Sequence, residues 1–161
     1  MATKQIAFTD DIDRVVRLQA RSIWYMGSCI KIHADAADTN GQFALLEVLM
    51  KPGSEPPLHY HENEDEFFLV LEGELAVTCD GKERILRPGE SIFLPRRIPH
   101  TFRILTSVAR TIGIVTPAGF EDFFRTLGQP IEDGEAFEPP PNPSFAQIAE
   151  VAGRFGSRVL R

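Results

Sequence analysis

Short β-rich segments, each followed by a turn signal, occupy most of residues 23–115 of this 161-residue chain. Val, Ile, Phe and Thr favour strands, and the Gly, Pro and Asn–Gly or Asp–Gly positions between them favour turns. Asp80 and Gly81 in particular favour a tight hairpin, because both tolerate a positive φ. No long helical pattern interrupts the strands, so an antiparallel all-β sandwich or barrel is expected rather than βαβ units. The nine expected strands span residues 23–26, 29–33, 43–50, 66–71, 74–79, 83–86, 91–94, 100–105 and 109–115.

The pattern changes after Pro117. Apolar residues with helical spacing from Phe120 to Leu127 predict a helix that ends at Gly128. The acidic, proline-rich residues 128–143 are expected to form an extended strap, because proline cannot donate a hydrogen bond within a sheet. A second helix should begin at Ser144. Its predicted apolar face consists of Phe145, Ile148, Ala149 and Ala152.

We expect a single domain over residues 1–161, with a barrel core at about 40–116 and a helical extension at 117–161. Residues 13–18 fit either a short helix or an edge strand. The formal net charge of −6 disfavours nucleic acid or an anionic membrane as a partner. No apolar run is long enough for a transmembrane helix, and the N-terminus does not resemble a secretory signal. Cys29 and Cys79 are too few for a disulfide framework, so a cytoplasmic location is the simplest expectation.

Three of the four histidines lie in one chemical pattern. His59 and His61 share a face of an extended segment, because alternate strand residues point the same way. Glu66 can return to that face if residues 62–65 form a turn, and His100 must come from a distant strand. Taken singly, each residue is more often solvated or packed than bound to an ion. The combination of His59, His61 and Glu66 inside the glycine frame 53–73, with His100 following it, predicts a metal site.

This pattern resembles the cupin superfamily. Gly53, His59, His61, Glu66 and Gly73 match the first cupin motif, and the segment RPGESIFLPRRIPH, which ends at His100, resembles the second. The resemblance covers about residues 40–116 and is strongest to the quercetin 2,3-dioxygenase-like group. One departure is Ile104, which occupies a position where cupins often carry asparagine.

The resemblance implies a double-stranded β-helix, or jelly-roll barrel, with two short C-terminal helices. It also implies that His59, His61, Glu66 and His100 bind one divalent metal ion. Fe, Mn, Ni, Co, Cu and Zn all suit three imidazoles and a carboxylate. Glu64 is the alternative carboxylate if Glu66 points away.

Strand alternation predicts which residues surround the metal. Phe68 and Val70 should lie on the same wall as Glu66, and Phe102 and Ile104 beside His100. Trp24, Met26 and Phe93 are further candidates. These side chains would make an apolar pocket, or would simply fill the barrel interior.

A metal-dependent dioxygenase acting on a flavonol-like or other aromatic or enolic small molecule is the leading functional hypothesis. Glu66 would be a metal ligand and a candidate base. A non-catalytic cupin that binds metal and a small molecule, and a metal-dependent isomerase or decarboxylase, are the alternatives. A DNA-binding regulator is disfavoured by charge. Residues 43–50 and 67–71 are apolar on both faces, so either the C-terminal helices or a second subunit should cover them, and we favour a homodimer.

Overall fold

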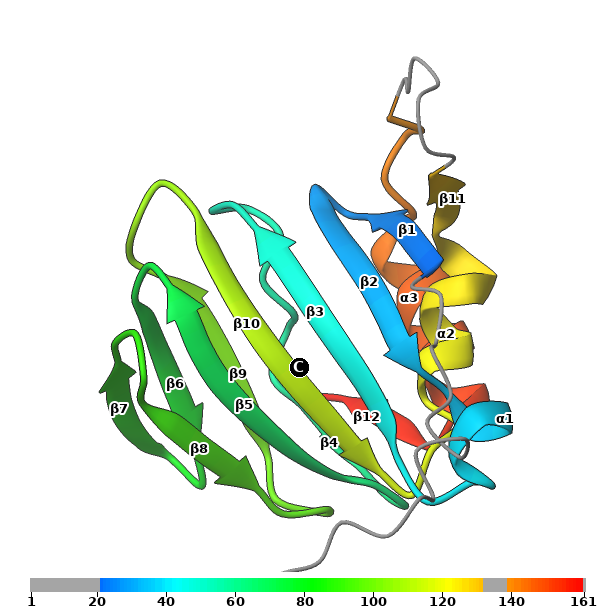
Figure 1. Cartoon of the computed structure of the whole chain (residues 1–161), viewed down its shortest axis with the longest axis horizontal. Coiled ribbons are helices and arrows are strands. Elements are labelled where there is room, and N and C mark those ends of the chain that lie inside the picture. The colour runs from blue at the N-terminus through cyan, green and yellow to red at the C-terminus, as the bar shows by residue number, and fades with distance from the viewer. Residues whose placement is uncertain (1–20, 132–138, 161) are drawn as a thin grey trace, which may run out of the picture.

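Two antiparallel β-sheets face each other in the computed structural model, which describes residues 21–131 and 139–160 (Figure 1). The seven-stranded sheet contains, in spatial order, β11 (Gln129–Ile131), β1 (Arg21–Tyr25), β2 (Ser28–Ala34), β3 (Ala44–Met50), β10 (Ala109–Thr116), β5 (Asp65–Glu72) and β8 (Ser91–Leu94). The five-stranded sheet contains β12 (Ser157–Val159), β4 (His59–His61), β9 (His100–Ile104), β6 (Leu75–Cys79) and β7 (Lys82–Leu86). The helices are α1 (Ala36–Thr39), α2 (Glu121–Leu127) and α3 (Phe145–Arg154).

This arrangement confirms the predicted jelly roll. All nine expected strands are present, with ends within two residues of the prediction. The nine expected strands did not include β4, which was expected only as an extended segment, or β11 and β12. The one-turn helix α1 was not predicted either, because three or four residues carry no readable period. Residues 13–18 lie outside the described part of the chain. Among the described residues, no helix is long and apolar enough to cross a membrane.

Two hairpins have the same tight turn. Asp80 and Gly81, with φ of 52° and 70°, connect β6 to β7 as predicted. Met26 and Gly27, with φ of 48° and 84°, connect β1 to β2 in the same way. The expected strand 23–26 therefore ends one residue early, and Met26 belongs to the turn.

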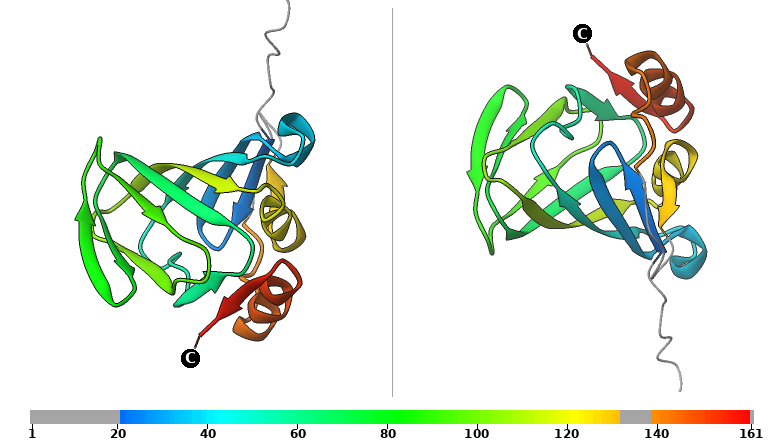
Figure 2. Two further views of the ribbon diagram at one scale, coloured as in Figure 1. Left: turned by 90° about the horizontal axis from the view of Figure 1, so that it is seen from below. Right: turned by 90° about the horizontal axis from the view of Figure 1, so that it is seen from above.

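The barrel interior contains two apolar clusters. One lies away from the helices and includes Val70, Leu75 and Ile104. The other includes Ile30, Ile32 and Val115 and continues into α2 and α3. The helices and β12 lie together on one side of the barrel (Figure 2), so the C-terminal extension forms part of the core.

Gly128 ends α2, as predicted, but for a different physical reason. Its φ of −90° is open to any residue. A Cβ atom at this position would lie only 2.6 Å from the carbonyl oxygen of Phe124 and 2.8 Å from that of Trp24. Glycine is therefore required here by the close packing of α2 against β1. The next residues form β11, an edge strand in which Pro130 lies opposite Ile23, as expected for the start of the strap. Residues 132–138 of the strap lie outside the described part of the chain.

The second predicted helix is confirmed, and one residue of its apolar face is wrong. The Ser144 hydroxyl caps α3 by accepting from the backbone N–H of Gln147 at 3.3 Å. Ile148, Val151 and Ala152 are buried. Phe145 is 52% exposed, because the first turn of α3 extends past the cluster on which the later turns pack.

Candidate metal centre

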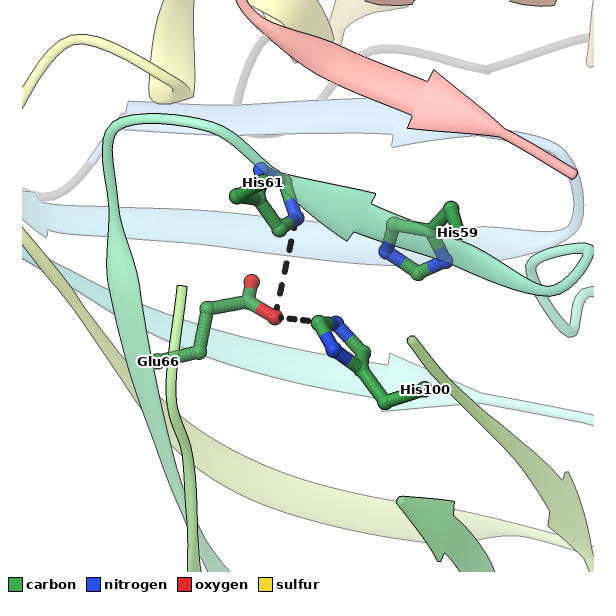
Figure 3. Close-up of side chains that lie close together, drawn as sticks. All are labelled: His59, His61, Glu66 and His100. Carbon is green, nitrogen blue, oxygen red and sulfur yellow. Dashed lines mark ion pairs between the residues drawn. The ribbon is translucent and has the colours of Figure 1, made fainter. Parts of the chain in front are cut away.

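Four side chains converge inside the barrel, as the sequence predicts. His59, His61, Glu66 and His100 each offer a ligand atom, and these atoms lie within 4.8 Å of one another (Figure 3). The closest pair joins Nε2 of His100 to Oε2 of Glu66 at 3.0 Å, and Nε2 of His61 lies 3.6 Å from the same oxygen. These four residues are close enough to bind one metal ion.

The two sheets supply the ligands together. β4 carries His59 and His61 and lies between β9 and β12, with His59 directly opposite His100. Glu66 comes from β5 of the seven-stranded sheet, where it faces Val115 and Leu94 on the buried side. The chain from β4 to β5 passes through residues 62–64, and this short turn carries Glu66 from one sheet to the other.

Backbone carbonyl groups fix two of the imidazoles. Nδ1 of His59 lies 2.8 Å from the carbonyl oxygen of Pro57, and Nδ1 of His100 lies 2.9 Å from that of Ile98. A carbonyl oxygen only accepts, so each Nδ1 must carry the proton. Each Nε2 is then an unprotonated nitrogen directed to the cluster, which is the form that binds a metal.

A buried carboxylate faces the third imidazole. Oε2 of Glu64 lies 3.6 Å from Nδ1 of His61, and both side chains are buried. Glu64 is thus on the opposite side of the ring from Glu66. The alternative in which Glu64 replaces Glu66 as ligand does not fit this geometry.

The donor atoms fit a metal ion better than they fit one another. Both ring nitrogens of His61 and Nε2 of His100 are buried and make no hydrogen bond to any described residue. The 3.0 Å approach of His100 to Glu66 lacks hydrogen-bond geometry. An unsatisfied buried polar atom costs about 1–3 kcal/mol, and one cation at the point of convergence would satisfy several of them.

The electrostatics favour an ionised carboxylate. Burial raises the pKa of Glu66, but the nearby imidazoles of His61, His100 and His59 outweigh it and lower that pKa to about 2. Burial, with the neighbouring His100, lowers the pKa of His59 to about 4. Burial also lowers the pKa of His61, but Glu66 and Glu64 outweigh it and raise that pKa overall. At neutral pH, His59 is ready to bind a cation, while His61 competes for a proton.

An apolar cavity of about 150 Å³ extends from the four ligands. Three of the predicted pocket residues line it: Met26, Phe68 and Phe102. Val70 and Ile104 point inward as expected but pack in the apolar cluster that lies away from the helices. The backbone N–H of Ile104 donates to Oε1 of Glu55 at 3.2 Å.

Two of the pocket predictions are wrong. Phe93 is 58% exposed and lies opposite Phe67 on the outer side of the sheet, while its neighbour Leu94 faces inward opposite Glu66. Trp24 does not line the cavity, because Ile23 is the inward residue at this end of β1. Neither segment has a sequence pattern that identifies its buried face.

One wall of the cavity is aromatic, which the sequence patterns did not predict. Phe120, Phe123 and Phe124 line the cavity from the start of α2, and Tyr25 joins them from β1. The ring centroid of Phe120 lies 4.3 Å from that of His61 in an edge-to-face contact. The helical spacing of these phenylalanines predicts an apolar face, but it cannot show that the face reaches the metal ligands.

Comparisons with known proteins agree with this geometry. The family model described as Cupin domain matches residues 46–114. Quercetin 2,3-dioxygenase of Bacillus subtilis is 36% identical over 102 residues, which are 63% of this chain and 30% of that protein. The alginate biosynthesis protein AlgA of Pseudomonas putida is 28% identical over 109 residues, 62% of this chain and 22% of that protein. The chain therefore spans less than a third of these curated relatives.

Solved structures show the same fold. KdgF from a Halomonas species has a TM-score of 0.54 at 24% identity, covering 60% of this chain and 84% of that one. An RmlC-like cupin from Shewanella frigidimarina also has a TM-score of 0.54 at 24% identity, covering 66% and 89%. The family match over residues 46–114, with the motif residues gathered at one point inside the barrel, shows that this part of the chain is a cupin domain.

Proposed function

We propose that this protein is a metal-dependent dioxygenase acting on a flavonol-like or other aromatic or enolic small molecule. One observation supports it best. The three histidines and the carboxylate of the ligand cluster line the same cavity as a group of apolar and aromatic side chains. The similarity to quercetin 2,3-dioxygenase of Bacillus subtilis adds support.

His59, His61, Glu66 and His100 would hold one divalent ion, with Fe, Mn, Ni, Co, Cu and Zn all compatible with this donor set. When bound, such an ion supplies a Lewis acid and, where it is redox-active, the means to react with dioxygen. The protein contributes the fixed imidazoles, the apolar walls that exclude water, and one ionised carboxylate.

Glu66 is the candidate base. It is 8% exposed and faces the same point as the imidazoles, so it can accept a proton from a substrate hydroxyl group that reaches the cluster. Its pKa of about 2 makes it a weak base. An acidic enol or phenol can transfer a proton to such a carboxylate far more readily than a sugar hydroxyl can.

The lining of the cavity also separates the functional alternatives. Among the described residues, no lysine or arginine lines it. Arg96 pairs with Asp65 at 2.8 Å, and Arg103 pairs with Glu83 on the surface at 2.8 Å. An isomerase or decarboxylase of an anionic substrate would need a basic side chain in the pocket in addition to the metal ion, so a neutral aromatic or enolic substrate fits better.

Oxygen uptake tests the proposal. The metal-free protein is loaded separately with Fe²⁺, Mn²⁺, Co²⁺, Ni²⁺, Cu²⁺ or Zn²⁺ and supplied with 3-hydroxyflavone or with one-ring enols such as 3-hydroxy-4-pyranone. Uptake with at least one metal is expected. Glu66→Gln should abolish it, whereas Glu72→Gln, an exposed residue at the end of the same strand, should leave it unchanged.

The metal content of Glu66→Gln separates the roles of this residue. Loss of uptake with the metal retained supports a role as base, and loss of both supports a role as ligand alone. If no metal and no enol gives uptake, the proposal fails and the non-catalytic binding alternative takes its place.

A further inference from the structure

The cavity is small for the proposed substrate class. Its volume of about 150 Å³ equals that of an engineered apolar protein cavity that holds a single benzene molecule. A flavonol has three rings, and its enolic head is only one of them. The size of the cavity therefore limits how many rings a substrate can have, whereas its apolar lining does not.

Interlocked aromatic side chains set this size. The ring of Phe124 meets that of Tyr25 at 5.6 Å and that of Phe120 at 5.7 Å, both edge to face. On the other side, the rings of Phe68 and Phe102 meet edge to face at 6.2 Å. Edge-to-face contacts of this kind stabilise each ring position by about 0.5–1.5 kcal/mol beyond burial, so the walls resist displacement by a larger ligand.

The part of this wall around Phe124 comes largely from the C-terminal extension. Phe120, Phe123 and Phe124 come from the α2 region, and Ile148 and Ala152 come from α3. All five lie beyond residues 46–114, the part of the chain that matches the family model. The four ligand residues lie within the part of the chain that matches the family model, whereas these five residues of the wall lie in the C-terminal extension.

We propose that the cavity admits a single-ring enol or phenol and excludes three-ring flavonols, with Phe124 as a residue that determines this selectivity. The inference rests on the proposed function, because it assumes that the substrate reaches the metal cluster. It narrows the substrate class to compounds with one ring and an acidic hydroxyl group. Phe124 is half-buried and forms no part of the ligand set, so its truncation can enlarge the cavity without removing a ligand.

Binding under nitrogen tests the inference apart from turnover. Co²⁺-loaded protein is titrated with 3-hydroxy-4-pyranone and with 3-hydroxyflavone, which carry the same chelating head and differ in their additional rings. Titration of free Co²⁺ and measurement of retained metal control for chelation in solution. Apolar area alone would make the flavonol bind tighter. We expect the opposite order, with the pyranone binding at least tenfold tighter to the wild-type protein.

The variant Phe124→Ala should strengthen 3-hydroxyflavone binding at least tenfold and leave pyranone binding within a factor of about three. Phe145→Ala, which removes an exposed phenylalanine of α3 that does not line the cavity, should change neither. Equal or tighter flavonol binding to the wild type, or no pyranone binding, overturns the inference. Pyranone binding without oxygen uptake in any metal form would instead overturn the proposed function and leave this inference intact.

A second inference comes from the outer face of the seven-stranded sheet. Cross-strand register places Phe93, Phe67, Ile114 and Leu45 in one row over β8, β5, β10 and β3. No described element covers this face, which is turned toward the viewer (Figure 1). Its large apolar side chains are Phe43, Leu45, Leu49, Phe67, Leu69, Leu71, Phe93, Ile112 and Ile114.

The area of this outer face matches a dimer interface. Phe93, Leu49 and Leu71 are 58%, 44% and 37% exposed. With roughly 200 Å² for a fully exposed large side chain, the nine residues leave roughly 500 Å² of apolar surface. A standard interface buries about 800 Å² per partner, of which about 65% is apolar in homodimers.

The polar residues on the same face suit a second copy of the chain. Lys31 and Glu47 lie opposite each other on β2 and β3, and Arg110 pairs with Glu47 at 3.2 Å. A two-fold interface brings a surface against itself, so charged residues on it find partners only if both signs are present, as they are on this face. We infer that two chains associate through the outer face of the seven-stranded sheet.

Light scattering after size exclusion tests this inference at about 20 µM protein. The wild type should have twice the 18.0 kDa mass of one chain. The double variant Leu49→Glu/Phe93→Glu should be monomeric and keep its Co²⁺ affinity, whereas Phe145→Glu should remain dimeric. A monomeric wild type, or a dimeric double variant, would overturn the inference.

Discussion

Ser157 of β12 lies directly opposite His61 of β4, so a strand near the end of the chain holds the strand that carries two metal ligands. The backbone N–H of Glu62 donates to the carbonyl of Gly156 at 2.8 Å, and that of Leu160 donates to Leu58 at 2.8 Å. β4 meets its other neighbour, β9, only at the pair His59 and His100. β12 therefore helps to position His61, together with the backbone N–H of Arg97, which donates to the carbonyl oxygen of His61 at 2.7 Å.

Gly156→Ala is expected to weaken metal binding as well as stability. Gly156 has a φ of 73°, and an added Cβ would collide with the side-chain amide of Asn63 beside β4. Strain of this kind costs about 1–3 kcal/mol. We expect a loss of stability of that size in urea unfolding and a several-fold weaker Co²⁺ affinity by calorimetry.

Gly89→Ala is the matched control. Its φ of 88° imposes similar strain, but no atom lies within 4 Å of the added Cβ. It should lower stability by about 1 kcal/mol and leave Co²⁺ affinity unchanged. If both variants weaken metal binding equally, β12 has no specific role in positioning β4.

Glu64→Leu should weaken metal binding roughly tenfold. Glu64 is the only described acceptor that faces Nδ1 of His61, at 3.6 Å, and an acceptor behind a metal-bound imidazole typically changes metal affinity 10–100-fold. Glu64→Gln keeps an acceptor oxygen and should retain most of the affinity. Calorimetric titration with Co²⁺ measures both, and equal affinities for the two variants would rule out orientation of His61 by Glu64.

Metal binding should release a proton from His61. Its pKa is raised overall by Glu66 and Glu64, so below that raised pKa the ring is protonated and the ion must displace the proton. His59, with a pKa of about 4, is already neutral. Apparent metal affinity should therefore rise with pH through the pKa of His61, while proton release declines.

Calorimetry in two buffers with different ionisation enthalpies measures this release. At pH 6 the apparent binding enthalpy should depend on the buffer, and this dependence should weaken as the pH rises through the raised pKa of His61. An affinity that increases as the pH falls would contradict the assignment.

Asp35 should stabilise the junction between α1 and α2. Its carboxylate caps α1 by accepting from the backbone N–H of Ala37 at 3.0 Å, and it also accepts from Arg125 of α2 at 2.6 Å. Asp35→Ala is expected to lower the free energy of unfolding by about 2 kcal/mol at pH 7. Asp122→Ala removes an exposed partner of the same arginine and should cost much less.

The pH dependence of the Asp35 effect has a defined sign. Burial raises the pKa of Asp35, but the hydrogen bond from Arg125, with further contributions from Asp38 and Arg21, outweighs it and lowers that pKa. The stabilisation is therefore present above the ordinary aspartate pKa and is lost as the pH falls through the lower folded value. Urea unfolding of wild type and Asp35→Ala should give converging stabilities at the most acidic pH. A difference that grows on acidification would contradict this.

The strands and the pair His59 and His61 could be predicted because they depend on short-range spacing, whereas His100 joined the expected ligand set through the resemblance to the cupin motifs. Alternation puts His59 and His61 on one face, and turn residues such as Asp80 and Gly81 end the strands where the structure ends them. The spacing from His61 to Glu66 predicts that both side chains face the same point if residues 62–65 form a turn. Phe93 could not be placed correctly, since both faces of β8 carry apolar residues and only the register with β5 decides which is buried.

The contribution of the C-terminal extension could not be predicted, because it depends on long-range packing. β12 has three residues, and its role follows only from its pairing with β4. Phe120 and Phe123 have helical spacing, but the contact between Phe120 and His61 joins segments about sixty residues apart. No local pattern encodes such a contact.

The carbonyl groups of Pro57 and Ile98 have a consequence for the kinetics of metal uptake. Each accepts a hydrogen bond from the histidine two residues further along the chain. The orientation of these two imidazoles is therefore fixed by the backbone next to them in sequence. These donors are preorganised: an arriving ion finds rings that need neither rotate nor exchange tautomers. The remaining adjustable ligand is His61, whose ring faces two carboxylates. Loss of the proton from this one ring should therefore limit the speed at which the site captures its ion.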